Sequence, residues 1–394
     1  MFHATKSWRT WGGLGICCIA QACSSGSADS NNSATAVDSD EASDLDVPVL
    51  GPSDDGGDFG PSDPSGSPAV DSPAGEFGDI STGEGTATPE PPGGGNSNIE
   101  PGTLTAGAWD DNRNLDRFLE YRADLYGSPM QGLLDFEEAD HLEAAAAAEQ
   151  LSAHVTLDVA LVIDSTGSMG DELAYLQSEF DALSLAIETQ YPGAEQRWAL
   201  VVYRDEGDEY ESRAFDFEAA SSFRGSLGAQ SSGGGGDIPE APDAAFDAMN
   251  QLSWRAGAGT ARLAFWVADA PHHAERAGRL SSAIRVAAGQ GIHLYPVASS
   301  GVNELTELSM RSAAQLTLGR YLFLTDDSGV GLDHKEPTIP CYFVTRLDDA
   351  ILRMVEIEMS GAYREPVASD VIRAGGNPAD GACLLESGQT VFAF

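Results

Sequence analysis

Residues 157–172 read LDVALVIDSTGSMGDE, and this stretch decides the fold of the chain. An unbroken apolar run from Val159 to Ile163 ends at Asp164, and a helical pattern begins soon afterwards. Such a run, without polar alternation, is typical of a strand that is covered on both faces. Thr166 and Ser168 follow Asp164 at spacings of two. One carboxylate and two hydroxyls therefore gather at the carboxyl end of a strand, where open α/β sheets bind ligands.

Strand and helix patterns alternate along the rest of the chain. We expect strands at 157–164, 197–204, 262–268, 292–298 and 320–324, an alternating edge strand at 213–218, and helices at 170–190, 240–253, 275–290, 303–317 and 346–360. This alternation predicts an α/β fold with a doubly wound, mostly parallel sheet and helices on both faces.

Two further segments should meet Asp164 at the carboxyl edge of this sheet. One is the glycine-rich stretch GGGGDIPEA at 233–241, and the other is WVADAP at 266–271, in which a buried type of strand ends at Asp269. Carboxylates gathered at one edge repel each other strongly where the dielectric constant is low. A divalent cation removes that cost, and oxygen ligands suit Mg²⁺, Ca²⁺ or Mn²⁺.

The order of these motifs resembles the von Willebrand factor type A family over about residues 155–362. The Asp-x-Thr-x-Ser pattern at Asp164, Thr166 and Ser168 is similar to the metal-ion-dependent adhesion site of that family, and Asp269 stands where the family has its last acidic residue. The resemblance implies a Rossmann-like domain that holds Mg²⁺, Ca²⁺ or Mn²⁺. It also implies that an Asp or Glu of a partner protein completes the coordination of that ion.

The glycine-rich stretch departs from most of that family because it contains no threonine. Its Asp-Ile-Pro-Glu sequence at 237–240 resembles a loop of integrin β subunits, in which the glutamate takes the place of the threonine. The resemblance implies that Glu240 is a ligand of the central metal. It also implies flanking cation sites, one at Asp171 and Glu172, and another at Asp205, Asp237 and the carbonyl of Pro239.

Plainer interpretations of these residues stay open. In one, Asp164 is only a helix cap, while Asp237 and Glu240 are the solvated acidic start of a helix. The neighbouring histidines His272 and His273 point in different directions and have no matching Cys or His pair, so we expect residues of a surface loop and no zinc site.

Charge divides the chain unevenly. With 21 Lys+Arg against 62 Asp+Glu, a net charge of −41, the chain lacks the basic surface that nucleic-acid binding requires. No Lys or Arg occurs between Ser24 and Ala108, so we expect a disordered acidic linker at 23–103. A short helical arm at 104–154 should then lead into the type A-like domain at 155–362, and a C-terminal extension at 363–394 should add an edge strand.

The first residues resemble the signal of a bacterial lipoprotein. Lys6 and Arg9 precede a short apolar stretch that cannot span a bilayer, and Cys23 follows it. We expect residues 1–22 to be removed and Cys23 to carry lipid. This predicts a protein of the bacterial cell envelope that touches the membrane only through its lipid anchor. Ordinary secretion is the alternative.

Only two cysteines, Cys341 and Cys383, belong to the part that we expect to fold. In an exported protein such a pair more often forms a disulfide than not, so we expect one here. Two buried, unpaired thiols are the alternative.

The sequence favours a non-enzymatic function. Phosphoryl transfer through an aspartyl intermediate would need a second carboxylate two residues after Asp164, where Thr166 stands, and neither a GxSxG elbow nor a nucleotide loop is found. We therefore expect an envelope-tethered, cation-dependent adhesion module that engages a carboxylate of an unidentified protein. A structural scaffold subunit and a metal-dependent hydrolase are the alternatives, in that order.

Overall fold

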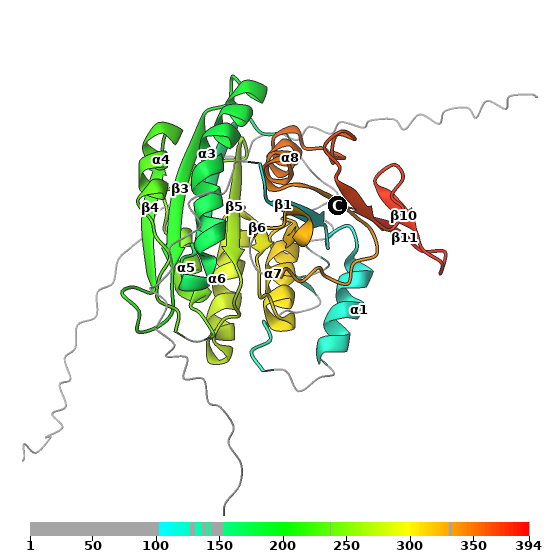
Figure 1. Ribbon diagram of the computed structural model, residues 1–394, viewed down its shortest axis with the longest axis horizontal. Coiled ribbons are helices and arrows are strands. Elements are labelled where there is room, and N and C mark those ends of the chain that lie inside the picture. The colour runs from blue at the N-terminus through cyan, green and yellow to red at the C-terminus, as the bar shows by residue number, and fades with distance from the viewer. Residues whose placement is uncertain are drawn as a thin grey trace, which may run out of the picture. The chain divides into compact units, whose positions relative to one another are not determined.

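The part of the chain that the computed structural model describes comprises residues 102–126, 131–135, 139–140, 142, 153–236, 238–330 and 333–393 (Figure 1). The expected signal peptide, Cys23, almost all of the acidic linker and Asp237 lie outside these residues, as does most of the alanine-rich stretch before residue 153.

Within the described residues, nine strands form one sheet in the order β4-β3-β2-β5-β6-β7-β1-β8-β9. The five strands from β3 to β7 in that order run parallel. The remaining neighbours pair antiparallel: β4 with β3, β1 with both β7 and β8, and β9 with β8. The strands are β1 (Thr105–Trp109), β2 (Thr156–Asp164), β3 (Gln196–Tyr203), β4 (Ser212–Glu218), β5 (Thr260–Ala268), β6 (His293–Ala298), β7 (Tyr321–Thr325), β8 (Tyr342–Arg346) and β9 (Arg373–Gly375). A separate hairpin consists of β10 (Ala382–Leu384) and β11 (Thr390–Phe392).

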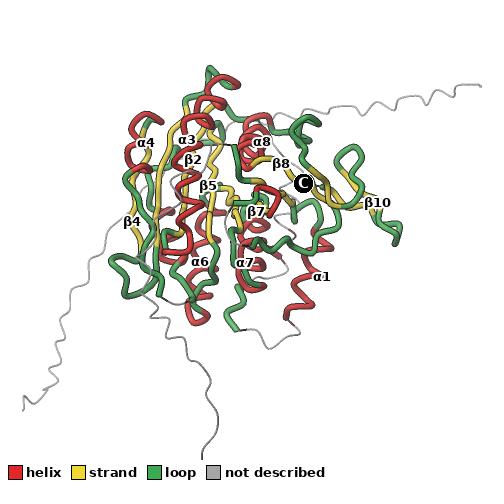
Figure 2. Tube along the Cα trace, in the orientation of Figure 1, coloured by secondary structure: helices red, strands yellow, loops and turns green. Residues whose placement is uncertain are grey.

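Helices cover both faces of the sheet (Figure 2). The helices are α1 (Leu115–Tyr126), α3 (Gly170–Gln190), α4 (Ala220–Gly228), α5 (Pro242–Asn250), α6 (Ala277–Gly289), α7 (Glu304–Leu316) and α8 (Leu347–Ser360). Residues of α5, α6 and α7 pack into the core on one face, and residues of α3, α4 and α8 pack into the core on the other. In the described part of the chain, no helix combines the length and the apolar character that a membrane crossing requires.

The apolar residues of β2 contribute side chains to the cores on both faces of the sheet. Successive strand residues point to opposite faces, so Ala160 and Val162 enter the core under α5 and α6, whereas Leu161 and Ile163 enter the core under α3. This arrangement confirms the predicted doubly wound α/β fold with a mostly parallel sheet. The predicted helix at 170–190 has the same bounds as α3, and the predicted edge strand at 213–218 is β4.

The N-terminal arm contains the expected helix as α1, but it begins with a strand. Its residues Thr105–Trp109 form β1, which lies inside the sheet between β7 and β8. The segment reads TAGAW and has too few large apolar residues to show a strand period. Gly107 is necessary there, because a Cβ on this residue would lie 2.2 Å from the ring of Phe323.

The C-terminal extension supplies the edge strand β9, which pairs with β8. The structure joins Cys341, next to β8, and Cys383, in β10, by a disulfide with a Cα–Cα distance of 5.9 Å. The covalent link holds the hairpin of β10 and β11 against the edge of the sheet.

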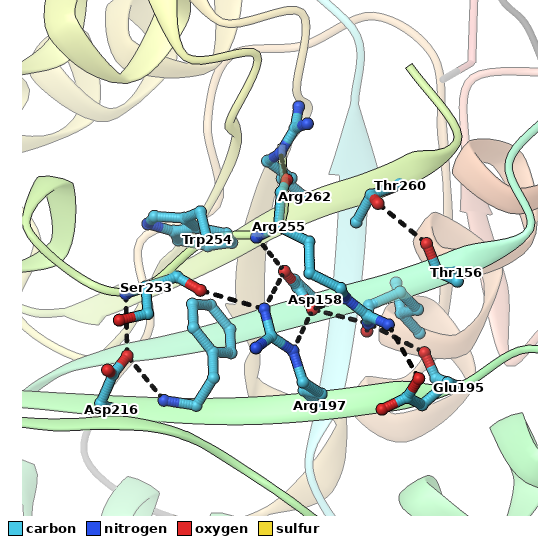
Figure 3. Close-up of polar contacts among 12 residues, drawn as sticks. Thr156, Asp158, Glu195, Arg197, Asp216, Ser253, Trp254, Arg255, Thr260 and Arg262 are labelled. Carbon is cyan, nitrogen blue, oxygen red and sulfur yellow. Dashed lines mark hydrogen bonds and ion pairs between the residues drawn. The ribbon is translucent and has the colours of Figure 1, made fainter. Parts of the chain in front are cut away.

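A buried aspartate organises the amino end of the parallel strands (Figure 3). Asp158 of β2 accepts hydrogen bonds from Arg197 Nε at 2.9 Å and from the backbone and Nε of Arg255, both at 2.8 Å. Arg255 also donates to the carbonyl of Glu195 at 2.9 Å. Burial alone raises the pKa of Asp158, but the hydrogen bonds from both arginines outweigh it and hold the pKa below its ordinary value. The cluster ties β2, β3 and the segment before β5 together.

We predict that Asp158→Asn lowers the free energy of unfolding by about 3 kcal/mol at pH 7, since breaking a buried ion pair leaves charge uncompensated. Because the pKa of Asp158 is lowered in the folded state, its stabilisation is present above the unfolded pKa and disappears as the pH falls through the folded one. The difference between wild type and variant should therefore shrink below about pH 4 in urea unfolding.

The control is Glu195→Gln, which removes an exposed carboxylate 3.5 Å from Arg255. Surface pairs contribute about 0–1 kcal/mol. Equal losses of stability in the two variants would contradict the role of Asp158.

Candidate metal centre

Three segments meet at the carboxyl edge of the parallel strands, at the opposite end of β2 from Asp158. Asp164 ends β2 and lies level with Tyr203, the last residue of β3. The neighbouring strand β5 ends at Ala268, so Asp269 is the first residue beyond it. The acidic residues at the ends of β2 and β5 are therefore neighbours because adjacent parallel strands end together.

The glycine loop, residues 233–240, is joined to both strand ends by backbone hydrogen bonds. Gly233 N donates to Ser165 O at 3.0 Å, directly after β2. Glu240 N donates to Pro271 O at 2.9 Å, shortly after β5. The loop thus bridges the two strand ends, as the sequence predicted.

Hydroxyl groups connect the two aspartates. Asp164 Oδ1 accepts from Thr166 N at 2.9 Å and from Thr166 Oγ1 at 2.7 Å. Thr166 Oγ1 lies 3.4 Å from Ser168 Oγ, and the Ser168 hydroxyl is near enough to Asp269 to offset part of the rise in pKa that burial causes there. Ser168 is exposed, whereas Asp164 and Thr166 are buried, so this chain of oxygens runs from the interior to solvent.

Glu240 reaches the same cluster across Gly235. A Cβ on Gly235 would lie 2.6 Å from Thr166 Cβ and 2.9 Å from Glu240 Oε1, and the φ of Gly235 is +65°. Thr166 and the Glu240 carboxyl therefore face each other across a position that only glycine can occupy.

Four carboxyl groups crowd this edge, and each has one buried oxygen without a hydrogen-bond partner among the described residues. These oxygens are Asp164 Oδ2, Glu172 Oε2, Glu240 Oε2 and Asp269 Oδ1. Burial, followed by the charge of Asp269, raises the pKa of Asp164 to about 7. Burial, followed by the charge of Asp164, raises the pKa of Glu240 to about 9. Burial also raises the pKa of Asp269, and it raises that of Glu172 to about 7.

This donor set fits a divalent cation. Carboxylate and hydroxyl oxygens are the ligands of Mg²⁺, Ca²⁺ and Mn²⁺, and an ion would satisfy buried oxygens that the described protein groups leave unpaired. His, Cys, Asp and Glu side chains alone form no metal-holding group of three or more in the described part of the chain. The set therefore depends on the two hydroxyls as well as the carboxyls. The residues that would hold the ion are Asp164, Thr166, Ser168, Glu240 and Asp269.

The structure gives the surroundings of the residues that the resemblance places at flanking sites, except Asp237, which lies outside the described residues. Glu172 is buried and accepts from Ser300 Oγ at 3.3 Å, and the charge of Asp269 adds to the effect of burial in raising its pKa. Its neighbour Asp171 is half-buried. Asp205 pairs with His273 Nε2 at 2.5 Å. Pro239 is half-buried and lies in the loop before α5, which starts at Pro242.

Two residues near the site have roles that the sequence analysis did not predict. Asp208 Oδ2 accepts from Gly235 N at 2.9 Å, and its charge contributes to the raised pKa of Glu240. The buried Arg204 donates to Ser231 O at 3.0 Å and so holds the start of the glycine loop. The sequence does give a signal for Arg204, because a basic residue directly after a buried strand needs hydrogen-bond acceptors. It gives no such signal for Asp208, which stands in an irregular loop.

His272 corrects the expectation of two surface histidines. It is 2% exposed, and its Nε2 lies 2.7 Å from the carbonyl of Gly132. Burial lowers its pKa, so it is a neutral packing residue beneath the site.

Comparison with known proteins gives structural similarity only. No protein-family model and no curated protein matches the chain. The pilus adhesin SpaC from Lactobacillus rhamnosus GG is similar at 10% identity and a TM-score of 0.35, over 45% of this chain and 29% of that one. The conserved hypothetical protein BatB from Bacteroides thetaiotaomicron is similar at 15% identity and a TM-score of 0.35, over 51% of this chain and 98% of that one. This chain thus spans less than a third of the length of the adhesin.

We predict that Glu240→Gln raises the melting temperature of the metal-free protein. The pKa of Glu240 is raised from its ordinary value to about 9 in the folded state, so the native state carries a penalty that grows as the pH rises from about 4.5 towards 9. The variant should melt a few degrees higher at pH 8 in EDTA, and the gain should be small at pH 4, by differential scanning calorimetry.

Glu188→Gln, at an exposed position of α3, is the matched control and should leave the melting temperature unchanged. A lower melting temperature for Glu240→Gln at pH 8 would show that the cluster carries no net repulsion.

A second prediction concerns the glycine loop. Gly235→Ala should destabilise the protein by about 2 kcal/mol or more, because alanine is strained at positive φ and its Cβ would overlap Thr166. Gly236→Ala is the control, since a Cβ there meets nothing within 4 Å. Denaturant unfolding compares the two, and equal stabilities would disprove the close approach of Thr166 and Glu240.

Proposed function

We propose that this protein is a divalent-cation-dependent binding module without catalytic activity, and that it engages a carboxylate of a partner protein. The observation that carries the proposal is the set of buried carboxyl oxygens that the described residues leave without a hydrogen-bond partner where three segments meet. A divalent cation held by Asp164, Thr166, Ser168, Glu240 and Asp269 supplies an electrophilic position that a partner's Asp or Glu can complete.

The surroundings of Ser168 support binding over catalysis. Its hydroxyl lies 3.4 Å from Thr166 Oγ1 and near Asp269, and neither residue is the histidine base that usually activates a nucleophilic serine. Of the two histidines nearest in the sequence to Asp269, His273 pairs with Asp205, and His272 contacts Gly132. In the described part of the chain, no hydrogen bond joins Ser168 to a histidine.

The resemblance of the Asp-x-Thr-x-Ser pattern to the von Willebrand factor type A family supports the same function. The lipoprotein-like start and the acidic segment that follows it would present the module from a bacterial envelope on a long tether. In this proposal the exposed side of the oxygen cluster, at Ser168, is the side that meets the partner.

The test is calorimetric titration of Mg²⁺, Ca²⁺ and Mn²⁺ into the full chain. We expect saturable binding of at least one ion, and at least tenfold weaker binding by Asp164→Ala. Asp181→Ala, which removes an exposed carboxylate of α3, is the control and should bind as the wild type does. No saturable binding by the wild type would refute the proposal.

Glu240→Ala separates the three classes of function. A binding module loses a metal-dependent partner, which a pull-down from envelope extract with and without chelator detects. If the protein is a scaffold subunit, the substitution lowers its melting temperature in the presence of metal. If it is a hydrolase, the substitution lowers its turnover rate.

A further inference from the structure

The strand β4 leaves one edge of the sheet open among the described residues, because it pairs with β3 and stands at the end of the strand order. Arg204 N donates to Glu211 O at 3.1 Å, and the register pairs Arg213 with Val202. In antiparallel pairs, hydrogen-bonded and non-hydrogen-bonded residues alternate. Glu211 and Arg213 therefore bond back to β3, whereas the backbone N–H and C=O groups of Ser212 and Ala214 point to the open edge.

A groove of about 510 Å³ runs along this edge between β4 and α5. On the strand side it is lined by Ser212, Ala214 and Asp216, which alternate along β4 and so share one face. On the helix side it is lined by Ala244 and Ala248, one turn apart on α5. These small side chains leave room for an extended segment beside the open edge.

The groove is acidic. Three carboxylates line it, on Glu211, Asp216 and Asp247, against one cation, Arg279. Arg279 is already engaged by Asp247 at 2.8 Å and by the buried Asp243 at 2.8 Å. Glu211 lies 3.7 Å from Arg276. The Asp216 carboxylate accepts hydrogen bonds from the backbone N–H groups of Phe217 and Ser253 (Figure 3), and its charge also interacts with Arg197.

We propose that this groove binds an extended, basic peptide segment of another protein, which adds to β4 as a further strand. Main-chain hydrogen bonds to Ser212 and Ala214 would provide affinity, and alternate Lys or Arg side chains would reach the carboxylates of the groove. A second copy of this chain is a poor occupant, because its net charge of −41 opposes self-association. The site uses none of the metal ligands and does not rest on the function proposed above.

The test measures the fluorescence anisotropy of a labelled hexapeptide of alternating Lys and Val with the full chain in EDTA. A chain of this charge attracts any cation, so the decisive comparison is an equally charged peptide with N-methylated backbone amides. We expect the N-methylated peptide and an alternating Glu-Val peptide to bind at least tenfold more weakly. Binding should be the same with Mg²⁺ in place of EDTA, which separates this result from that of the metal centre.

The variant Ala248→Phe fills the groove and should weaken binding of the Lys-Val peptide at least tenfold. Ala182→Phe, at an exposed position of α3, is the matched control and should bind as the wild type does. Hydrogen exchange of the wild type needs no variant and should show protection of Ser212 and Ala214 by the peptide. Equal binding of the N-methylated peptide, unchanged binding by a folded Ala248→Phe, or exchange protection elsewhere would each overturn the proposal. The proposal would also be overturned if sedimentation showed a dimer and hydrogen exchange showed Ser212 and Ala214 already protected in it without peptide.

Discussion

The repulsion among buried carboxyl groups at the carboxyl edge of the sheet is the constraint on which this structure depends. Its strength is clear from the two aspartates of β2, Asp158 and Asp164, which are both fully buried. At one end, Arg197 and Arg255 surround Asp158 and hold its pKa below the ordinary value. At the other end, Asp164 meets hydroxyls and further carboxyls, and burial with the charge of Asp269 raises its pKa to about 7. The same side chain at similar burial is thus compensated by protein cations at one edge, whereas at the other edge one of its oxygens has no hydrogen-bond partner among the described residues.

The rest of the fold makes such crowding tolerable. Apolar side chains of β2 enter cores on both faces of the sheet, so the ends of β2 and β5 are fixed in register and cannot move apart to relieve the repulsion. The buried pairs Asp111–Arg311 at 2.8 Å and Asp110–Arg320 at 3.1 Å lock the residues after β1 to α7 and to the start of β7. The carboxyl edge therefore belongs to a scaffold that is stabilised elsewhere.

Charge gives the two proposed sites opposite preferences. At the metal centre, an ion would convert a repulsive cluster into a position that attracts a partner's carboxylate. In the groove beside β4, the carboxylates outnumber their cation and favour a basic segment. The metal centre and the open edge are close in the topology, since Ser212 of β4 pairs with Tyr203 at the carboxyl end of β3.

The sequence by itself determined the elements whose signals are local. The apolar run of β2, the helix at 170–190 and the acidic residues at the strand ends follow from periodicity and from the rule that parallel strands end together. Only the tertiary structure decided that TAGAW is an inner strand, that Glu172 is buried against Ser300, and that Asp205 pairs with His273. These outcomes depend on contacts between residues far apart in the chain, and no local pattern encodes which distant side chain will fill a given place.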